Sequence, residues 1–255
     1  MQYPSALLLF ILVASNATAA DVTKLADEYV AAVKATYPEV ATFSGLALDR
    51  HDGLMDNSQA GRVKWEAFED RIAKEVAAID SSTLRGKPEW VIHGFLREAV
   101  ESGRVTRVCR NDLWSVNQMS GWQTWMTQLA SIQPVGSEKA RQEALARWRK
   151  VPRFIDNEIA NLRIGLREGY STPKRNVELV IEQLDQLLAL PVEKWPLYHP
   201  ATRDDSVEFK KAWAELLTSQ LTPAIKRFRD FLENEYAGKA IWRSEERRVG
   251  KECRS

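Results

Sequence analysis

From Val151 to Leu190 the chain reads VPRFIDNEIANLRIGLREGYSTPKRNVELVIEQLDQLLAL. Apolar side chains recur every three or four residues in both halves of this segment, which predicts two amphipathic helices. Pro152 suits the start of the first helix and Gly169 its end, and Thr172-Pro173 suits the start of the second. The two stripes consist of Phe154, Ile155, Ile159, Leu162 and Leu166, and of Val177, Val180, Ile181, Leu184 and Leu188.

The same periodicity extends over the rest of the chain. It predicts helices over 22–33, 61–79, from Pro88 onward, between Gly121 and Gln133, over 138–151 and over 206–236, with Pro223 kinking or splitting the last one. Turn-forming residues predict a loop over 38–60, and prolines punctuate 191–200. No strand-like alternation of useful length occurs. We therefore expect an all-α, multi-helix domain with an orthogonal or bundle-like arrangement.

The composition is that of a globular protein and argues against nucleic-acid binding. Of the 255 residues 44% are hydrophobic and 28% charged, as in globular proteins, and the net charge is only +1. Lysines and arginines alternate with acidic residues along the expected helices, so no basic surface for nucleic acid is predicted.

The first twenty residues are typical of a secretory signal peptide. An apolar run from Ala6 to Ala14, too short to span a bilayer, is followed by Ser15-Asn16 and the small-x-small pattern Ala17-Thr18-Ala19. We expect residues 1–20 to be removed and the protein to be periplasmic or secreted. A buried N-terminal helix is the alternative. No second long apolar run occurs, so we expect no membrane attachment after cleavage.

The last residues, 243–255, read RSEERRVGKECRS and resemble the translation of a short-read sequencing adapter. They show no apolar period and follow abruptly on a helix. We therefore expect a helical domain over 21–242 and a non-native tail over 243–255.

Familiar catalytic patterns are absent from the sequence. No Gly-x-Ser-x-Gly elbow, phosphate-binding glycine loop or His-Glu-x-x-His zinc helix occurs, and the three histidines are scattered. We expect no catalytic residue, no metal ligand and no cofactor within this chain.

A cluster of tryptophan and amide side chains is the best candidate for binding. A concave surface that grips a peptide or a sugar could be formed by Trp114, Asn117, Gln118, Trp122 and Gln123, because tryptophan stacks and amides pair with backbone-like groups. The same residues could equally fill the core beside amide-bonded turns. Arg163 could bind a carboxylate, or lie on a solvated helix edge.

Several short motifs together resemble the bacterial domain-of-unknown-function family 885. They are Tyr37-Pro38-Glu39-Val40-Ala41-Thr42 with Gly45, Asn117-Gln118 with Gly121, Arg147-Trp148 with Val151-Pro152, Leu162-Arg163 with Gly165 and Gly169-Tyr170, and Val177 with Val180-Ile181 and Gln183-Leu184.

That resemblance implies an exported, helix-rich protein similar to zinc metallopeptidases, with peptides as substrates. The family's zinc helix would lie beyond the matched segment, so the resemblance implies zinc in a full-length member and an inactive N-terminal fragment here. The competing hypotheses are a non-catalytic periplasmic helical protein that binds peptide or glycan through residues 114–123, and a helical structural module.

Overall fold

The computed structural model describes residues 19–241. All but the last two residues of the predicted signal peptide, and the whole of the predicted tail over 243–255, lie outside that range. Ala19 and Ala20 belong to the first helix.

Within residues 19–241 the fold is all-α, as the periodicity predicts, and the only strand-like pairing is a single bridge between Pro173 and Ile241. The helices are α1 (Ala19–Thr36), α2 (Pro38–Phe43), α3 (Gln59–Ala77), α4 (Pro88–Thr106), α5 (Trp122–Ile132), α6 (Glu138–Trp148), α7 (Val151–Glu168), α8 (Lys174–Leu188), α9 (His199–Thr202), α10 (Val207–Leu216) and α11 (Thr222–Phe231).

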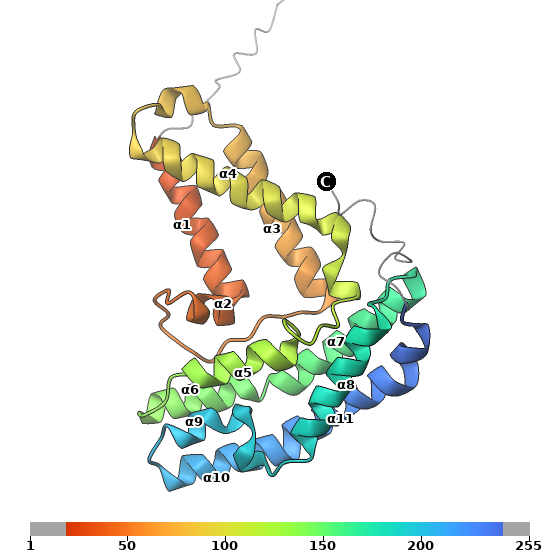
Figure 1. The fold of residues 1–255 in the computed structure, drawn as a ribbon. Helices are drawn as coiled ribbons and strands as arrows, with labels where there is room; N and C mark the ends of the chain where they lie inside the picture. The colour runs from red at the N-terminus through yellow and green to blue at the C-terminus, as the bar shows by residue number, and fades with distance from the viewer. Residues whose placement is uncertain (1–18, 242–255) are drawn as a thin grey trace, which may run out of the picture.

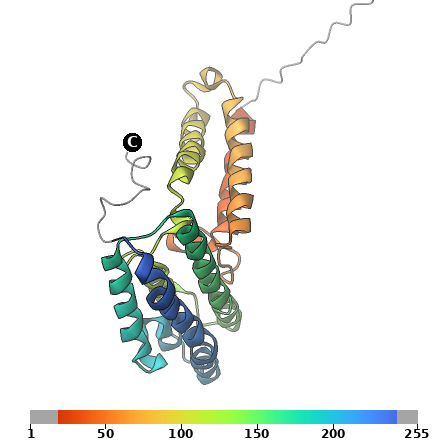
Figure 2. The ribbon, with the colours of Figure 1, turned by 90° about the vertical axis from the view of Figure 1, so that its right-hand side faces the viewer.

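Helices α1, α3 and α4 form a three-helix unit that stands on one side of the molecule in both views (Figures 1 and 2). These helices enclose a small apolar core of their own. Its innermost members are Val22, Ile72, Val76, Leu84 and Val100.

Helices α5 to α11 form the larger part of the molecule, which lies below the three-helix unit in Figure 1. Their apolar stripes share a second core that includes Trp148 and Trp213, whose rings meet edge to face at 5.3 Å. Both stripes of the 151–190 segment face this core, with Ile155, Leu162 and Val177 fully buried.

Two sequence predictions are refined by the structure. Residues 38–43 form helix α2 instead of the start of a loop, because Pro38 occupies the first helical turn, where its missing N–H costs nothing. The expected break at Pro223 is confirmed. A π-helical turn over Leu217–Leu221 precedes Pro223 and separates α10 from α11.

The loop over 44–58 joins the two units, and the buried guanidinium of Arg147 holds it. Arg147 Nε donates to the carbonyl of Gly53 at 2.6 Å, Nη1 to Gln133 Oε1 at 3.0 Å and Nη2 to Thr42 Oγ1 at 3.3 Å. Arg147 is fully buried, and burial lowers its pKa to about 10. One α6 side chain thus fixes α2, the loop and the end of α5.

Buried acids fasten the same loop from both sides. The backbone N–H of Met55 donates to Glu39 Oε2 at 3.2 Å, and that of His51 donates to Glu143 Oε2 at 2.9 Å. Burial raises the pKa of Glu39. The loop's backbone is therefore hydrogen-bonded to α2 and α6 at residues 51, 53 and 55.

We predict that Arg147→Met lowers the free energy of unfolding by about 3 kcal/mol, because it leaves buried acceptors without a donor. Urea unfolding followed by circular dichroism measures this. Arg149→Met is the matched control, because Arg149 lies two residues after Arg147 and is exposed. It should change the free energy of unfolding by less than about 0.5 kcal/mol. Equal effects of the two variants would contradict a special role for Arg147.

Gly165 allows α7 to approach the turn over Asn111–Leu113. A Cβ atom at position 165 would lie 1.8 Å from the backbone carbonyl oxygen of Leu113, a distance that no side chain can occupy. Gly169 ends the same helix with φ of 84°, a left-handed conformation that favours glycine.

We predict that Gly165→Ala lowers the free energy of unfolding by about 2 kcal/mol or more, because the backbone must shift. Gly94→Ala, also within a helix, has nothing within 4 Å of its added Cβ and should raise stability by about 0.5 kcal/mol. Opposite signs for the two variants in thermal or urea unfolding are the expected result. A neutral Gly165→Ala would show that the close approach is not tightly packed.

Candidate functional site

A polar cavity of about 320 Å³ lies where the three-helix unit meets the larger bundle. We call it the junction pocket. It is lined by residues of the 44–58 loop, α3, the 111–120 segment, α5 and α7, among them Met55, Asp56, Asn57, Arg62, Asp112, Trp122, Trp125, Phe154, Glu158 and Asn161.

One face of α7 supplies the floor of this pocket. Phe154, Glu158 and Asn161 follow one another at helical spacing, so all three lie on one side of the helix. Phe154 packs edge to face against Trp125 of α5, with ring centroids 5.5 Å apart. The pocket-facing side of α7 is therefore apolar at Phe154 and polar at Glu158 and Asn161.

Asn57 connects the loop to this face of α7. Its Nδ2 donates both to the carbonyl of Phe154 at 3.0 Å and to Glu158 Oε1 at 2.7 Å, while its Oδ1 accepts from Asn157. Asn161 Nδ2 donates to the backbone carbonyl of Asn57 at 2.7 Å. The amide of Asn57 is consequently fixed in one orientation.

Gln59, at the start of α3, completes the network. Its Nε2 donates to Asn161 Oδ1 at 2.9 Å and to Asp112 Oδ2 at 2.8 Å. Ser58 caps α3 by accepting from the N–H of Gly61. The polar wall of the junction pocket thus combines groups from both units.

Glu158 forms no ion pair with a lysine or arginine within residues 19–241. Asp112, by contrast, lies 3.5 Å from Arg62 Nε and 3.6 Å from Arg110 Nε. Burial, together with the negative charge of Asp112, raises the pKa of Glu158 to about 7, although the hydrogen bond from Asn57 opposes the shift. This carboxyl group changes its charge near neutral pH.

Of the candidate residues predicted from sequence, the structure places Trp122 in the junction pocket. Trp122 is 95% buried, and its ring also packs edge to face on Phe228 at 5.2 Å. Trp114 lies apart from the pocket and donates from Nε1 to the carbonyl of Cys109 at 2.8 Å. Trp122 therefore belongs to the hydrophobic core and also lines the pocket.

Asn117 and Gln118 build the turn that precedes α5. Asn117 Oδ1 accepts from the N–H of Met119 at 2.7 Å, and the backbone carbonyl of Gln118 accepts from Gln183 Nε2 at 3.0 Å. Gln123 donates to the Asn117 carbonyl and to Gln183 Oε1. These amides link α5 to α8 and are not among the residues that line the junction pocket.

Arg163 lies on the exposed side of α7. Its guanidinium donates to both carboxylate oxygens of Glu235 and stacks over the ring of Phe231 at 5.2 Å. In this structure Arg163 therefore pairs with a carboxylate of the same chain on an exposed helix edge.

The sequence interpretation missed Asn57, Trp125, Glu158 and Asn161. The available signal was the placement of Glu158 and Asn161 at helical spacing after Phe154, on a helix whose inner face is otherwise apolar. Their partners lie about a hundred residues earlier, so no local pattern indicates that they meet.

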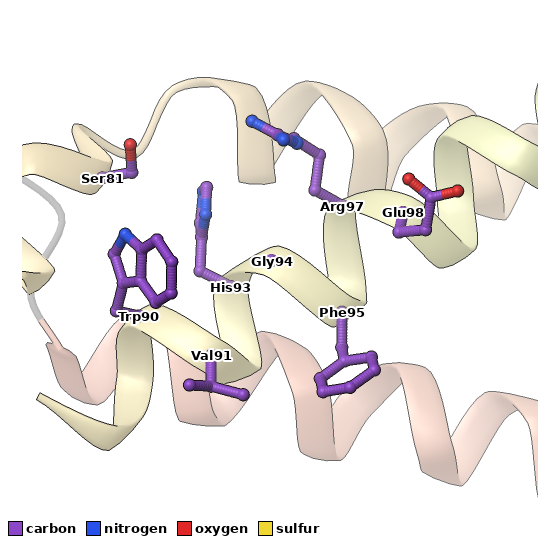
Figure 3. A pocket seen from close by; sticks show the side chains of 8 residues that line it. All are labelled: Ser81, Trp90, Val91, His93, Gly94, Phe95, Arg97 and Glu98. Carbon is purple, nitrogen blue, oxygen red and sulfur yellow. The ribbon is translucent and has the colours of Figure 1, made fainter.

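A second hollow lies on α4, bordered by Ser81, and holds about 430 Å³ (Figure 3). Figure 3 shows Val91 and Phe95 pointing away from the side on which His93 and Arg97 lie. Phe95 is 75% exposed, and His93 Nε2 lies 3.2 Å from the carbonyl of Val76. This hollow is shaped by essentially one helix and brings few polar groups together, so the junction pocket is the better candidate.

Residues 19–241 contain neither a cluster of metal-ligand side chains nor a membrane-spanning helix. No three histidine, cysteine, aspartate or glutamate side chains gather there as metal ligands would. In the same range, each helix is too short or too polar to cross a bilayer.

Comparisons with known proteins give a family and a fold. The model of the family described as "Bacterial protein of unknown function (DUF885)" matches residues 38–253. The matched range includes most of the predicted tail, whose foreign origin stays a prediction. No curated protein sequence matches the chain.

The fold is also found in solved structures, among them the crystal structure of "the putative lipoprotein from Colwellia psychrerythraea", with a TM-score of 0.66 and 17% sequence identity. The similarity covers 86% of this chain and 42% of that chain. This chain therefore spans less than half the length of that structural relative.

We predict that Glu158→Gln changes how stability depends on pH. Because the pKa of Glu158 is raised from 4.5 to about 7 on folding, the folded state holds an extra proton between these values, and stability falls as pH rises through this window. The variant lacks this loss. Its free energy of unfolding relative to the natural protein should therefore rise between about pH 5 and about pH 8.

Urea unfolding at both pH values measures this difference. Glu178→Gln on the exposed side of α8 is the control and should show the same pH dependence as the natural protein. Parallel curves for Glu158→Gln would mean that Glu158 ionises at its ordinary pKa.

Proposed function

This chain belongs to the bacterial DUF885 family, and we propose that its helical domain binds peptides for an exported protein similar to zinc peptidases. The observation that carries the proposal is the junction pocket, where aromatic rings and fixed amide and carboxyl groups face one cavity. The domain's own contribution is binding, not bond cleavage.

The chemistry of the pocket suits a peptide. Trp122, Trp125 and Phe154 offer apolar surface to a side chain, while oriented amides and a carboxyl group offer hydrogen bonds to polar groups. A cavity of about 320 Å³ accommodates one side chain with its adjoining backbone.

The residues described do not fit a zinc centre, since no three potential ligands gather within 19–241. The resemblance to zinc metallopeptidases implies a metal that would activate a water molecule, with ligands outside the matched motifs. The structural relative is more than twice as long as the part that this chain matches, which supports the proposal that other segments would supply such a centre. No hydrolytic step is assigned to the described residues.

Export is also part of the proposal. It is supported by the signal-peptide pattern over 1–20 and by the description of the structural relative as a lipoprotein. We place the protein in the periplasm or outside the cell, with peptides as partners, without nucleic acid and without a membrane after signal cleavage.

A second candidate function is a non-catalytic protein that binds peptide or glycan. It is favoured by the tryptophan and amide lining of the same pocket, because aromatic rings stack on sugars and amides pair with hydroxyl groups. The two candidates differ in ligand and in whether a zinc peptidase activity accompanies binding.

We predict that Trp125→Ala weakens binding of short peptides about tenfold, because it removes one wall of the junction pocket. Isothermal titration calorimetry with a mixed set of tripeptides and oligosaccharides measures this. Trp90→Ala, on the exposed face of α4, is the control and should bind normally.

The same purified chain, incubated with peptides and zinc, should show no cleavage that a chelator abolishes. Binding of oligosaccharides and not peptides would favour the second candidate. Chelator-sensitive cleavage would contradict the assignment of a binding role alone, and peptide binding that is insensitive to Trp125→Ala would remove the pocket from the proposal.

A further inference from the structure

We infer that the junction pocket selects a primary ammonium group, with Glu158 as its counter-charge and the neighbouring aromatic rings around its alkyl stem. This inference rests on the proposed peptide-binding function and deepens it by naming the group that is recognised.

The carboxylate of Glu158 is held in one orientation and can still accept a further hydrogen bond. Asn57 Nδ2 holds Oε1 at 2.7 Å, and Asn57 is itself fixed by Asn157 and Asn161. Oε2 makes no hydrogen bond or ion pair with any residue in 19–241. One carboxylate oxygen is therefore available to a donor from outside the protein.

The other charged groups around the pocket have partners. Asp112 lies beside Arg62 and Arg110, Arg62 also pairs with Glu66, and Asp56 Oδ1 accepts the N–H of Ser58. Tyr37 also lines the pocket, and burial together with nearby carboxylates raises its pKa to about 12, which keeps it neutral. Glu158 and Asp56 form no ion pair among the described residues of this pocket, and of the two it is Glu158 that lies on the α7 face beside Phe154.

Aromatic surface lies close to this carboxylate. Phe154 precedes Glu158 by one helical turn and contacts Trp125 edge to face, and Trp122 lines the same cavity. Ring faces attract cations and also cover alkyl stems, so a side chain that ends in an ammonium group fits both parts of the pocket.

The geometry favours an ammonium over a guanidinium group. A guanidinium binds a carboxylate best through two parallel hydrogen bonds, which need both oxygens. Asn57 already occupies Oε1, so a single-point donor matches Glu158 better. Two sources carry this chemistry, a lysine side chain and a free peptide amino terminus.

The test is calorimetric titration of the full chain at about pH 8 with four tripeptides of matched size. One has an acetylated amino terminus and a central lysine, one has a free amino terminus and central norleucine, one is acetylated with norleucine, and one is acetylated with arginine. We expect the acetylated norleucine peptide to bind at least about tenfold more weakly than an ammonium peptide. The arginine peptide should bind less tightly than the lysine peptide, and the stronger of the two ammonium peptides identifies the source.

Glu158→Gln should reduce the affinity of the ammonium peptide about tenfold and leave that of the norleucine peptide unchanged, since glutamine can still accept from Asn57. Glu178→Gln should change neither. In the natural protein, lowering the pH from about 8 to about 6 should weaken binding of the acetylated lysine peptide, whose own ammonium group stays charged, because Glu158 gains a proton.

Three outcomes would overturn the inference. If all four peptides bind alike, and neither Glu158→Gln nor pH alters the affinities, the pocket does not recognise charge, while the proposed peptide binding stands. If the arginine peptide binds most tightly, a guanidinium is the preferred group. If no peptide binds, the inference and the proposed function fall together.

Discussion

The structure depends on one buried guanidinium. Arg147 reaches from α6 to α2, to the 44–58 loop and to the end of α5, so elements far apart in the chain share a single hydrogen-bonding centre. An apolar side chain could fill the same space without fixing the backbone of the loop. Because Asn57 lies in that loop, the position of the junction pocket follows from the position of Arg147.

The helices could be predicted from the sequence because each one carries its own information. The apolar stripe of 177–188 and the proline and glycine at the ends of 152–169 predict helices without reference to any other part of the chain. Pro38 shows the limit of this approach. The same residue can end one helix and begin another, and only the downstream contacts, such as that of Thr42 with Arg147, favour the second role.

The site was less accessible to sequence reasoning. Trp122 could be selected because of its residue type, but a polar side chain on a helix is usually solvated, and nothing local distinguishes Glu158 from Glu168 on the same helix. The difference arises from Asn57, which is 101 positions away. The amide of Asn117 follows the alternative that the sequence left open, because its Oδ1 accepts a backbone N–H in the turn before α5.

The presence of two separate apolar cores has a consequence for the order of folding. Each core is enclosed within its own unit, whereas the contacts of Asn57 and Gln59 with α7 need both units in place. The pocket is therefore among the last features to form. Any ligand of the pocket binds only the assembled molecule, so it acts as a clamp that holds the two units together.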